Sequence, residues 1–143
     1  ILVFMKVNNI LIVLGEPQST FSEILYKYFK SREFLKNKKK IILIGSAILL
    51  QKQMKKLKFN LNLKLINNLN EAKIDKINIL NVNYNSHKIF SKISSNSNKY
   101  ISNCFKIALS LIKNNKKVAL INGPISKKYF LKKKYLGITE YIS

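Results

Sequence analysis

Hydrophobic residues along this chain gather in short runs that alternate with amphipathic segments. Four of the runs are short, rich in branched aliphatic side chains and bounded by polar residues, which predicts buried strands. They are residues 10–14, 41–44, 77–82 and 118–121. In residues 61–65 leucine alternates with asparagine and lysine, which is typical of a half-exposed strand. Gly15, Gly45 and Gly123 come after three of the buried runs and mark the strand ends.

Three segments between these runs have the spacing of amphipathic helices. The first is predicted to start from Ser22 as its cap and to end near Lys30. Its apolar face is made by Ile24, Leu25, Tyr28 and Phe29. The second is predicted from Ser46 to about Leu57. The third, over residues 97–113, carries a stripe of Ile101, Cys104, Phe105, Ala108, Leu111 and Ile112.

Strand and helix therefore alternate along a chain that shows no internal repeat and no linker rich in glycine or proline. This order predicts an α/β fold made of βαβ units, in one folded unit over residues 1–143. In such sheets ligands bind at the carboxyl ends of the strands. The loops after Leu14, Ile44 and Ile121 are therefore the candidate sites.

The chain carries a formal net charge of +21, from 27 Lys+Arg against 6 Asp+Glu. Such a charge alone would suggest a protein that binds nucleic acid. Arg32 is the only arginine, however, and the lysines are spread along the chain beside many asparagines and isoleucines, as AT-rich codons supply them. We therefore expect the lysines on solvated faces and no specific nucleic acid partner, and a basic nucleic-acid-binding domain stays the alternative.

Cys104 is the only cysteine, so no disulfide can form within the chain, and a cytoplasmic location fits. No apolar run approaches the roughly 20 residues of a membrane span, and Lys6 interrupts the apolar start where a secretory signal would be continuous. Met5 is a plausible true start, with residues 1–4 read through from upstream. The abrupt end after Ser143 suggests a partial reading frame.

Two loops carry candidate chemistry. Gly15-Glu16-Pro17 follows a buried strand, where a glycine allows a sharp turn and a following helix offers free amides to an anion; an ordinary turn is the alternative. Gly123-Pro124 fixes a tight turn that places Ser126 and Lys127 at the edge of the sheet. Lys127 could neutralise a substrate phosphate, or it could be a solvent lysine beside a capped helix start.

Together with residues 137–140, these loops resemble the N-terminal part of the 4-hydroxythreonine-4-phosphate dehydrogenase family, which has an isocitrate/isopropylmalate dehydrogenase-like fold. The family's first loop reads G-[DE]-P-A-G-x-G-P-E, and the matching positions here are Gly15, Glu16, Pro17 and Glu23. Its later motifs T-G-P-x-x-K and G-H-T-E are matched by Gly123, Pro124, Lys127, Gly137, Thr139 and Glu140. The resemblance spans residues 10–143, a little under half of a family member.

The chain also departs from the family pattern. Ser19 and Phe21 replace two glycines of the first loop, and Asn122 replaces the threonine of T-G-P. Ile138 stands where the family has a histidine that contacts substrate, whereas its neighbour Thr139 is retained. These changes are typical of a divergent branch of the family.

The resemblance implies a homodimeric enzyme that uses NAD to oxidise the secondary alcohol of 4-phosphooxy-L-threonine on the route to pyridoxal phosphate. It implies that substrate is contacted by Thr139, Ile138, Lys127, Gly123 and Pro124, beside an active-site loop of Gly15, Glu16 and Pro17. It also implies a divalent metal (Zn, Mg or Co), held with NAD mainly by residues beyond this chain. One alternative is a related dehydrogenase that acts on 4-phosphothreonate or 4-phosphoerythronate. Another is a fragment that has no activity of its own.

No metal ligand and no catalytic base is assigned within residues 1–143. His87 is the only histidine, in a polar loop that is expected to face solvent. The carboxylates show no pair at the spacing of metal ligands. Cys104 lies on the apolar stripe of a helix and is expected to be a core thiol, not a nucleophile.

Overall fold

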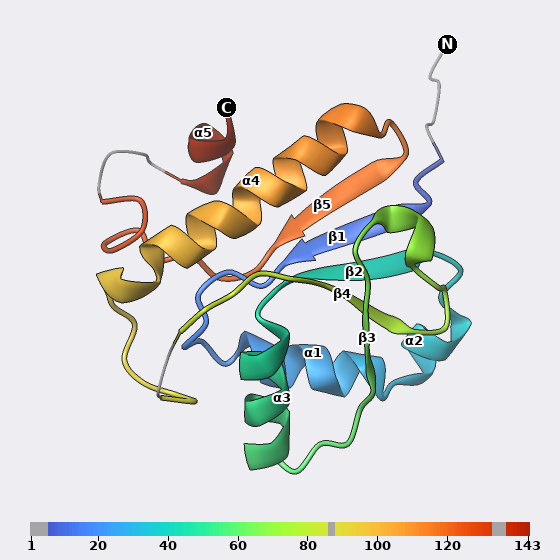
Figure 1. Cartoon of the computed structure of the whole chain (residues 1–143), viewed down its shortest axis with the longest axis horizontal. Helices are drawn as coiled ribbons and strands as arrows, with labels where there is room; N and C mark the ends of the chain where they lie inside the picture. The colour runs from blue at the N-terminus through green and yellow to red at the C-terminus, as the bar shows by residue number, and fades with distance from the viewer. Residues whose placement is uncertain (1–5, 86–87, 133–136) are drawn as a thin grey trace.

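The computed structural model describes residues 6–85, 88–132 and 137–143, and its strands form one parallel sheet in the order β3-β4-β2-β1-β5 (Figure 1). The strands are β1 (Asn9–Val13), β2 (Lys40–Gly45), β3 (Leu63–Leu65), β4 (Ile77–Asn81) and β5 (Val118–Asn122). The helices are α1 (Phe21–Phe29), α2 (Arg32–Lys36), α3 (Ala47–Lys56), α4 (Asn98–Asn114) and α5 (Ile138–Ile142), with short 3₁₀ turns η1 (Leu69–Glu71) and η2 (Ser95–Ser97). Met5 and His87 lie outside the described residues.

The sheet register brings the carboxyl ends of three strands together. β1 lies between β2 and the edge strand β5 and pairs in parallel with both, so that Val13 is level with Ile44 and Asn122. The predicted α/β class is therefore confirmed, and so is the prediction that the loops after these strands share one edge of the sheet.

Each face of the sheet buries a separate hydrophobic cluster. Alternate residues of a strand point to opposite faces, so Leu11 and Val13 pack in the cluster beneath α4, while Ile12 and Leu14 pack with α1 and α3. Figure 1 shows α4 on one side of the sheet and α1 and α3 on the other. A sheet covered on both faces explains why β1 and β2 read as continuous apolar runs. The prediction that residues 118–121 form a buried strand is wrong, because β5 lies at the edge of the sheet and Ile121 is 49% exposed.

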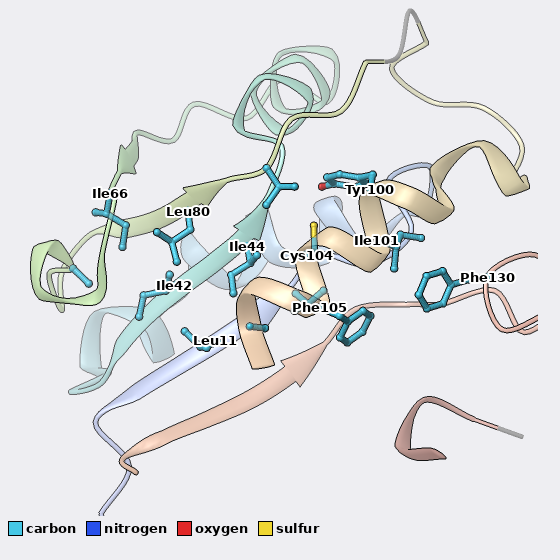
Figure 2. Packing of buried hydrophobic residues seen from close by; sticks show 14 of the residues in the cluster. Leu11, Ile42, Ile44, Ile66, Leu80, Tyr100, Ile101, Cys104, Phe105 and Phe130 are labelled. Carbon is cyan, nitrogen blue, oxygen red and sulfur yellow. The ribbon is translucent and has the colours of Figure 1, made fainter. Parts of the chain in front are cut away.

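The apolar stripe predicted on the third helix lies against the sheet. In Figure 2 Cys104 projects from α4 beside Ile44, and its side chain is fully buried. Burial raises the pKa of the Cys104 thiol to about 12, because the charged thiolate would lose its hydration. The predicted role of Cys104 as a core thiol is confirmed.

The first helix differs from its prediction in two respects: the residue at its N-cap, and the set of residues that face the core. Thr20, not Ser22, occupies the N-cap, and Ser22 is buried inside α1. Ile24, predicted on the apolar face, is 61% exposed, whereas Tyr26 is buried. The reason is tertiary, because the Tyr26 hydroxyl donates a hydrogen bond to the carbonyl of Leu50 and so turns this side of α1 toward α3.

The strand predicted over residues 61–65 is shorter than expected. β3 contains residues 63–65 only, and Leu65 is 63% exposed. β3 is an edge strand that pairs only with β4, so little holds a longer segment in the sheet. Helix α2 was not predicted from the pattern; its N-cap is Ser31, whose hydroxyl accepts a hydrogen bond from the backbone N–H of Phe34.

Within the described residues no lysine is buried, which agrees with the prediction that the positive charge lies on solvated faces. The same part of the chain contains no helix whose length and hydropathy would suit a membrane crossing.

Candidate functional site

The loops that follow β1 and β5 cross each other at the carboxyl edge of the sheet. The backbone N–H of Glu16 donates to the carbonyl of Pro124 at 2.7 Å, and the N–H of Gly123 donates to the carbonyl of Val13 at 2.7 Å. Gly15 and Gly123 therefore lie where two backbones touch, although they are far apart in the sequence.

Glycine is required at both positions by the close approach of the chains. Gly15 has a φ of +73°, and a Cβ added to it would lie 2.5 Å from the carbonyl oxygen of Pro124. A Cβ on Gly123 would lie 2.8 Å from the carbonyl carbon of Leu14 and nearer still to its oxygen. The two glycines thus join the loops to each other, a role that the sequence pattern did not reveal.

A surface pocket opens beside this crossing. Its described lining residues are Phe21, Asn122, Gly123, Pro124, Ile125, Lys127, Leu131 and Gly137. The pocket therefore brings three candidate residues of the second loop together with Gly137, whereas the other candidate residues are not among its described lining residues. Gly15, Glu16 and Pro17 lie behind the wall made by Gly123 and Pro124, and Glu16 and Pro17 line a neighbouring cavity.

The third motif reaches this pocket through Gly137, while Thr139 lies in the first turn of α5 with an exposed side chain. Thr139 is not among the residues that line the pocket. Ile138 begins α5 next to Gly137. Thr139 and Ile138 therefore stay predictions as substrate contacts.

Lys127 lies within a capped turn and is an exposed residue that lines the pocket. The hydroxyl of Ser126 accepts a hydrogen bond from the N–H of Tyr129 at 3.0 Å, and its carbonyl accepts from the N–H of Phe130 at 2.9 Å. Ser126 thus caps a turn, and Lys127 also lines the pocket, so the binding of a phosphate by Lys127 stays a prediction. An exposed ammonium at a concave surface can attract a phosphate as a point charge.

Glu16 is buried at the back of the site, with only 2% of its surface exposed. Its Oε1 accepts a hydrogen bond from the hydroxyl of Ser97 at 2.7 Å, and its Oε2 has no hydrogen-bond partner within the part of the chain that is described. Burial raises the pKa of the Glu16 carboxyl, and the Ser97 hydrogen bond opposes that shift only partly.

The raised pKa of Glu16 predicts a pH dependence of stability. As pH rises above the ordinary value of 4.5, the unfolded chain loses this proton before the folded chain does, so the free energy of unfolding falls. Glu16→Gln does not titrate and should escape this loss. We expect the stability of Glu16→Gln relative to wild type to increase from about pH 4 to about pH 7 in urea denaturation, and a constant difference would contradict the prediction.

Sequence reasoning missed two residues that hold the first loop. Ser97 reaches Glu16 across 81 positions of sequence, and Gln53 of α3 donates to the carbonyl of Pro17 at 2.8 Å. Gln53 offered a signal, because it falls at helical spacing with Leu49, Leu50 and Met54, and a polar residue on an apolar face is expected to have a buried partner.

No group of three His, Cys, Asp or Glu side chains that could hold a metal ion occurs within residues 6–85, 88–132 and 137–143. The described residues therefore do not fit a metal site, and no step of the chemistry is assigned to a metal held by them.

Comparison with known proteins agrees with the geometry. The chain matches the model of the family described as pyridoxal phosphate biosynthetic protein PdxA over residues 37–143. Among proteins of curated function, none matches.

Several solved structures share the fold, and two of them illustrate the similarity. One is a 4-hydroxythreonine-4-phosphate dehydrogenase from Burkholderia phymatum, with 18% identity and a TM-score of 0.78 over 95% of this chain and 42% of that one. Another, from Klebsiella pneumoniae, has 17% identity and a TM-score of 0.75 over 91% of this chain and 42% of that one.

These comparisons confirm the predicted resemblance and the isocitrate/isopropylmalate dehydrogenase-like fold class. The chain spans 42% of the length of each of these two dehydrogenases. Because the family model covers well over half of the chain, the protein belongs to the family of the pyridoxal phosphate biosynthetic protein PdxA.

Proposed function

We propose that this chain is the N-terminal part of a dehydrogenase that uses NAD to oxidise the secondary alcohol of 4-phosphooxy-L-threonine in the synthesis of pyridoxal phosphate. The observation that carries the proposal is the pocket in which Gly123, Pro124 and Lys127 meet Gly137 at the carboxyl edge of a parallel sheet. Membership of the family supports the substrate class.

The residues of this chain would bind and orient the substrate. Lys127 would neutralise the phosphate, while the rigid turn at Gly123 and Pro124 would form the wall against which the substrate lies. Thr139, at the margin of the pocket, would offer a hydroxyl to the substrate, with Ile138 beside it. Gly15, Glu16 and Pro17 would support this wall from behind.

The remaining parts of the reaction belong to residues outside this chain. When bound, NAD would supply the hydride acceptor and a divalent cation such as Zn, Mg or Co would supply the positive charge that favours ionisation of the alcohol, both held mainly by residues beyond this chain. The whole enzyme would be a cytoplasmic homodimer with two domains, of which residues 1–143 form part of one.

Ile138 favours a second candidate substrate. The family histidine at this position would hydrogen-bond to substrate, and isoleucine cannot, so a related sugar acid such as 4-phosphothreonate or 4-phosphoerythronate is the alternative. The test is the formation of NADH by the full-length protein with each of the three compounds. Oxidation of none of them would overturn the proposed function.

Lys127→Ala tests the phosphate site directly. Loss of the charge should raise KM for the phosphorylated substrate roughly 10-fold to 100-fold, because a hydrogen bond to a charged group is removed. Lys128→Ala is the matched control, since that neighbouring ammonium lies over the ring of Tyr129 at 5.1 Å and lines no wall of the pocket. An equal rise of KM in both variants would show that only the general positive charge matters.

A further inference from the structure

The loop of Gly15, Glu16 and Pro17 is held from three sides by separate segments of the chain. On one side the carbonyl of Pro124 accepts a hydrogen bond from the backbone N–H of Glu16. On another side the hydroxyl of Ser97, at the start of α4, donates a hydrogen bond to the carboxylate of Glu16. On the third side Gln53 donates to the carbonyl of Pro17. The first of these contacts links the loop directly to the wall of the substrate pocket.

Gln53 is the contact that joins this loop to the segment before α4. Its side chain is 3% exposed, and its Nε2 lies 2.8 Å from the carbonyl oxygen of Pro17 and 3.0 Å from that of Ile89. An amide nitrogen has two hydrogens to donate, so both are used on main-chain acceptors. Removing them would leave two carbonyl groups without this partner in a water-poor site.

The helix that carries Gln53 is a firm base for these contacts. The hydroxyl of Ser46 accepts from the N–H of Leu49 and caps α3, and the N–H of Ser46 donates to the buried Tyr100 hydroxyl at 2.8 Å. Leu50 and Met54, on either side of Gln53, are buried in the cluster beneath the sheet. Gln53 therefore links a packed helix to two irregular segments by hydrogen bonds and so fixes where those segments lie.

We infer that Gln53 is a positioning residue for the substrate pocket: it fixes the Gly15–Pro17 loop, and the hydrogen bond from Glu16 to Pro124 carries that position to the pocket wall. The inference rests on the proposed function, because it assigns the pocket to a phosphorylated alcohol. Gln53 touches no lining residue of the second loop itself and acts through Pro17 and Glu16.

The test compares Gln53→Leu with Asn78→Leu in the full-length protein. Asn78 is the matched control, since its buried amide donates to the carbonyls of Ile41 at 2.9 Å and Lys73 at 2.8 Å. It lies near the start of β4, at the end of the sheet away from the pocket. Asn78 makes more hydrogen bonds than Gln53, because its amide nitrogen also lies 3.2 Å from the carbonyl oxygen of Lys76 and its Oδ1 accepts from the N–H of Lys73 at 2.9 Å. Asn78→Leu should therefore destabilise the protein at least as much as Gln53→Leu.

The KM values distinguish a positioning role of Gln53 from a general loss of protein stability. Gln53→Leu should raise KM for the phosphorylated substrate about 10-fold and leave KM for NAD unchanged. Asn78→Leu should change neither KM, because a smaller folded fraction lowers only the apparent kcat. Equal KM values in wild type and Gln53→Leu would overturn the inference.

Hydrogen exchange gives a readout that does not depend on catalysis. In Gln53→Leu the peptides that contain Glu16 and Gly123 should exchange faster than in wild type, while those of β2 keep their protection. If wild type oxidises none of the three compounds, the proposed function fails, and the exchange result still decides whether Gln53 holds the loop. Unchanged exchange at Glu16 and Gly123 would overturn the positioning role.

Discussion

Gly123→Ala is expected to lower the free energy of unfolding by about 3 kcal/mol. The new methyl carbon would lie 2.8 Å from the carbonyl carbon of Leu14, which is backbone of a buried segment and cannot rotate away. The ring of Phe21, also at 2.8 Å, can move more easily. Relief of the clash must therefore separate the loops after β1 and β5. Urea denaturation of variant and wild type measures the loss.

The control for this change is Gly137→Ala. Gly137 lines the same pocket, yet a Cβ there would meet no heavy atom within 4 Å, and its φ of −168° is an extended conformation that any residue adopts. We expect a change within roughly 0.5 kcal/mol. Similar losses in the two variants would mean that the tight crossing of Gly123 and Leu14 is not the cause.

Phe105→Ala is expected to cost about 3 to 5 kcal/mol, because it removes a large side chain from a packed interior. Phe105 is 1% exposed in the cluster between α4 and the sheet (Figure 2). Its ring lies 6.2 Å from that of Phe130 and 5.7 Å from that of Tyr141, measured between centroids. The same residue thus holds the segment after β5 and helix α5 against α4, and both should loosen.

Lys106→Ala is the control on the same helix. Lys106 is exposed, and alanine is at least as good a helix former, so the free energy of unfolding should change by less than about 0.5 kcal/mol. Trypsin cleavage near Lys127 should become faster in Phe105→Ala only. Equal cleavage rates in Phe105→Ala and wild type would contradict the role of the aromatic cluster in holding this segment.

The strands were predictable because each has a local cause. A strand covered on both faces must be apolar at every position, and the runs at 10–14 and 41–44 therefore stand out without knowledge of their neighbours. The stripe on α4 was predictable for a similar reason, since Ile101, Cys104 and Phe105 must share one face of any helix.

The phase of α1 and the short β3 were not predictable in this way. Ile24 and Tyr26 are both apolar enough to be buried, and the contact between Tyr26 and Leu50 decided between them. Leu65 stands at an apolar position of an alternating pattern, which predicts a covered side chain, but it lies in an edge strand and is exposed. The face that α1 buries and the exposure of β3 both depend on which other elements pack against them.

The candidate site, too, has some features that the sequence predicted and others that it did not. Gly15, Gly123, Pro124 and Lys127 could be singled out from the order of residues, because a turn at the end of a strand has strong local requirements. Their meeting in one place followed from the parallel sheet, which was also predicted. Family membership, too, was visible in the spacing of these motifs.

The contacts that hold this site together could be identified only from the tertiary structure. Ser97 carries no local signature, and the position of Gln53 on an apolar helix face indicates a buried partner without saying which one; both residues matter because folding brings them to Glu16 and Pro17. Likewise the need for glycine at 123 comes from a carbonyl more than a hundred positions earlier in the chain. Hydrophobic periodicity reports which side of an element is covered, whereas hydrogen bonds and steric contacts between distant segments depend on register and packing, which no local pattern encodes.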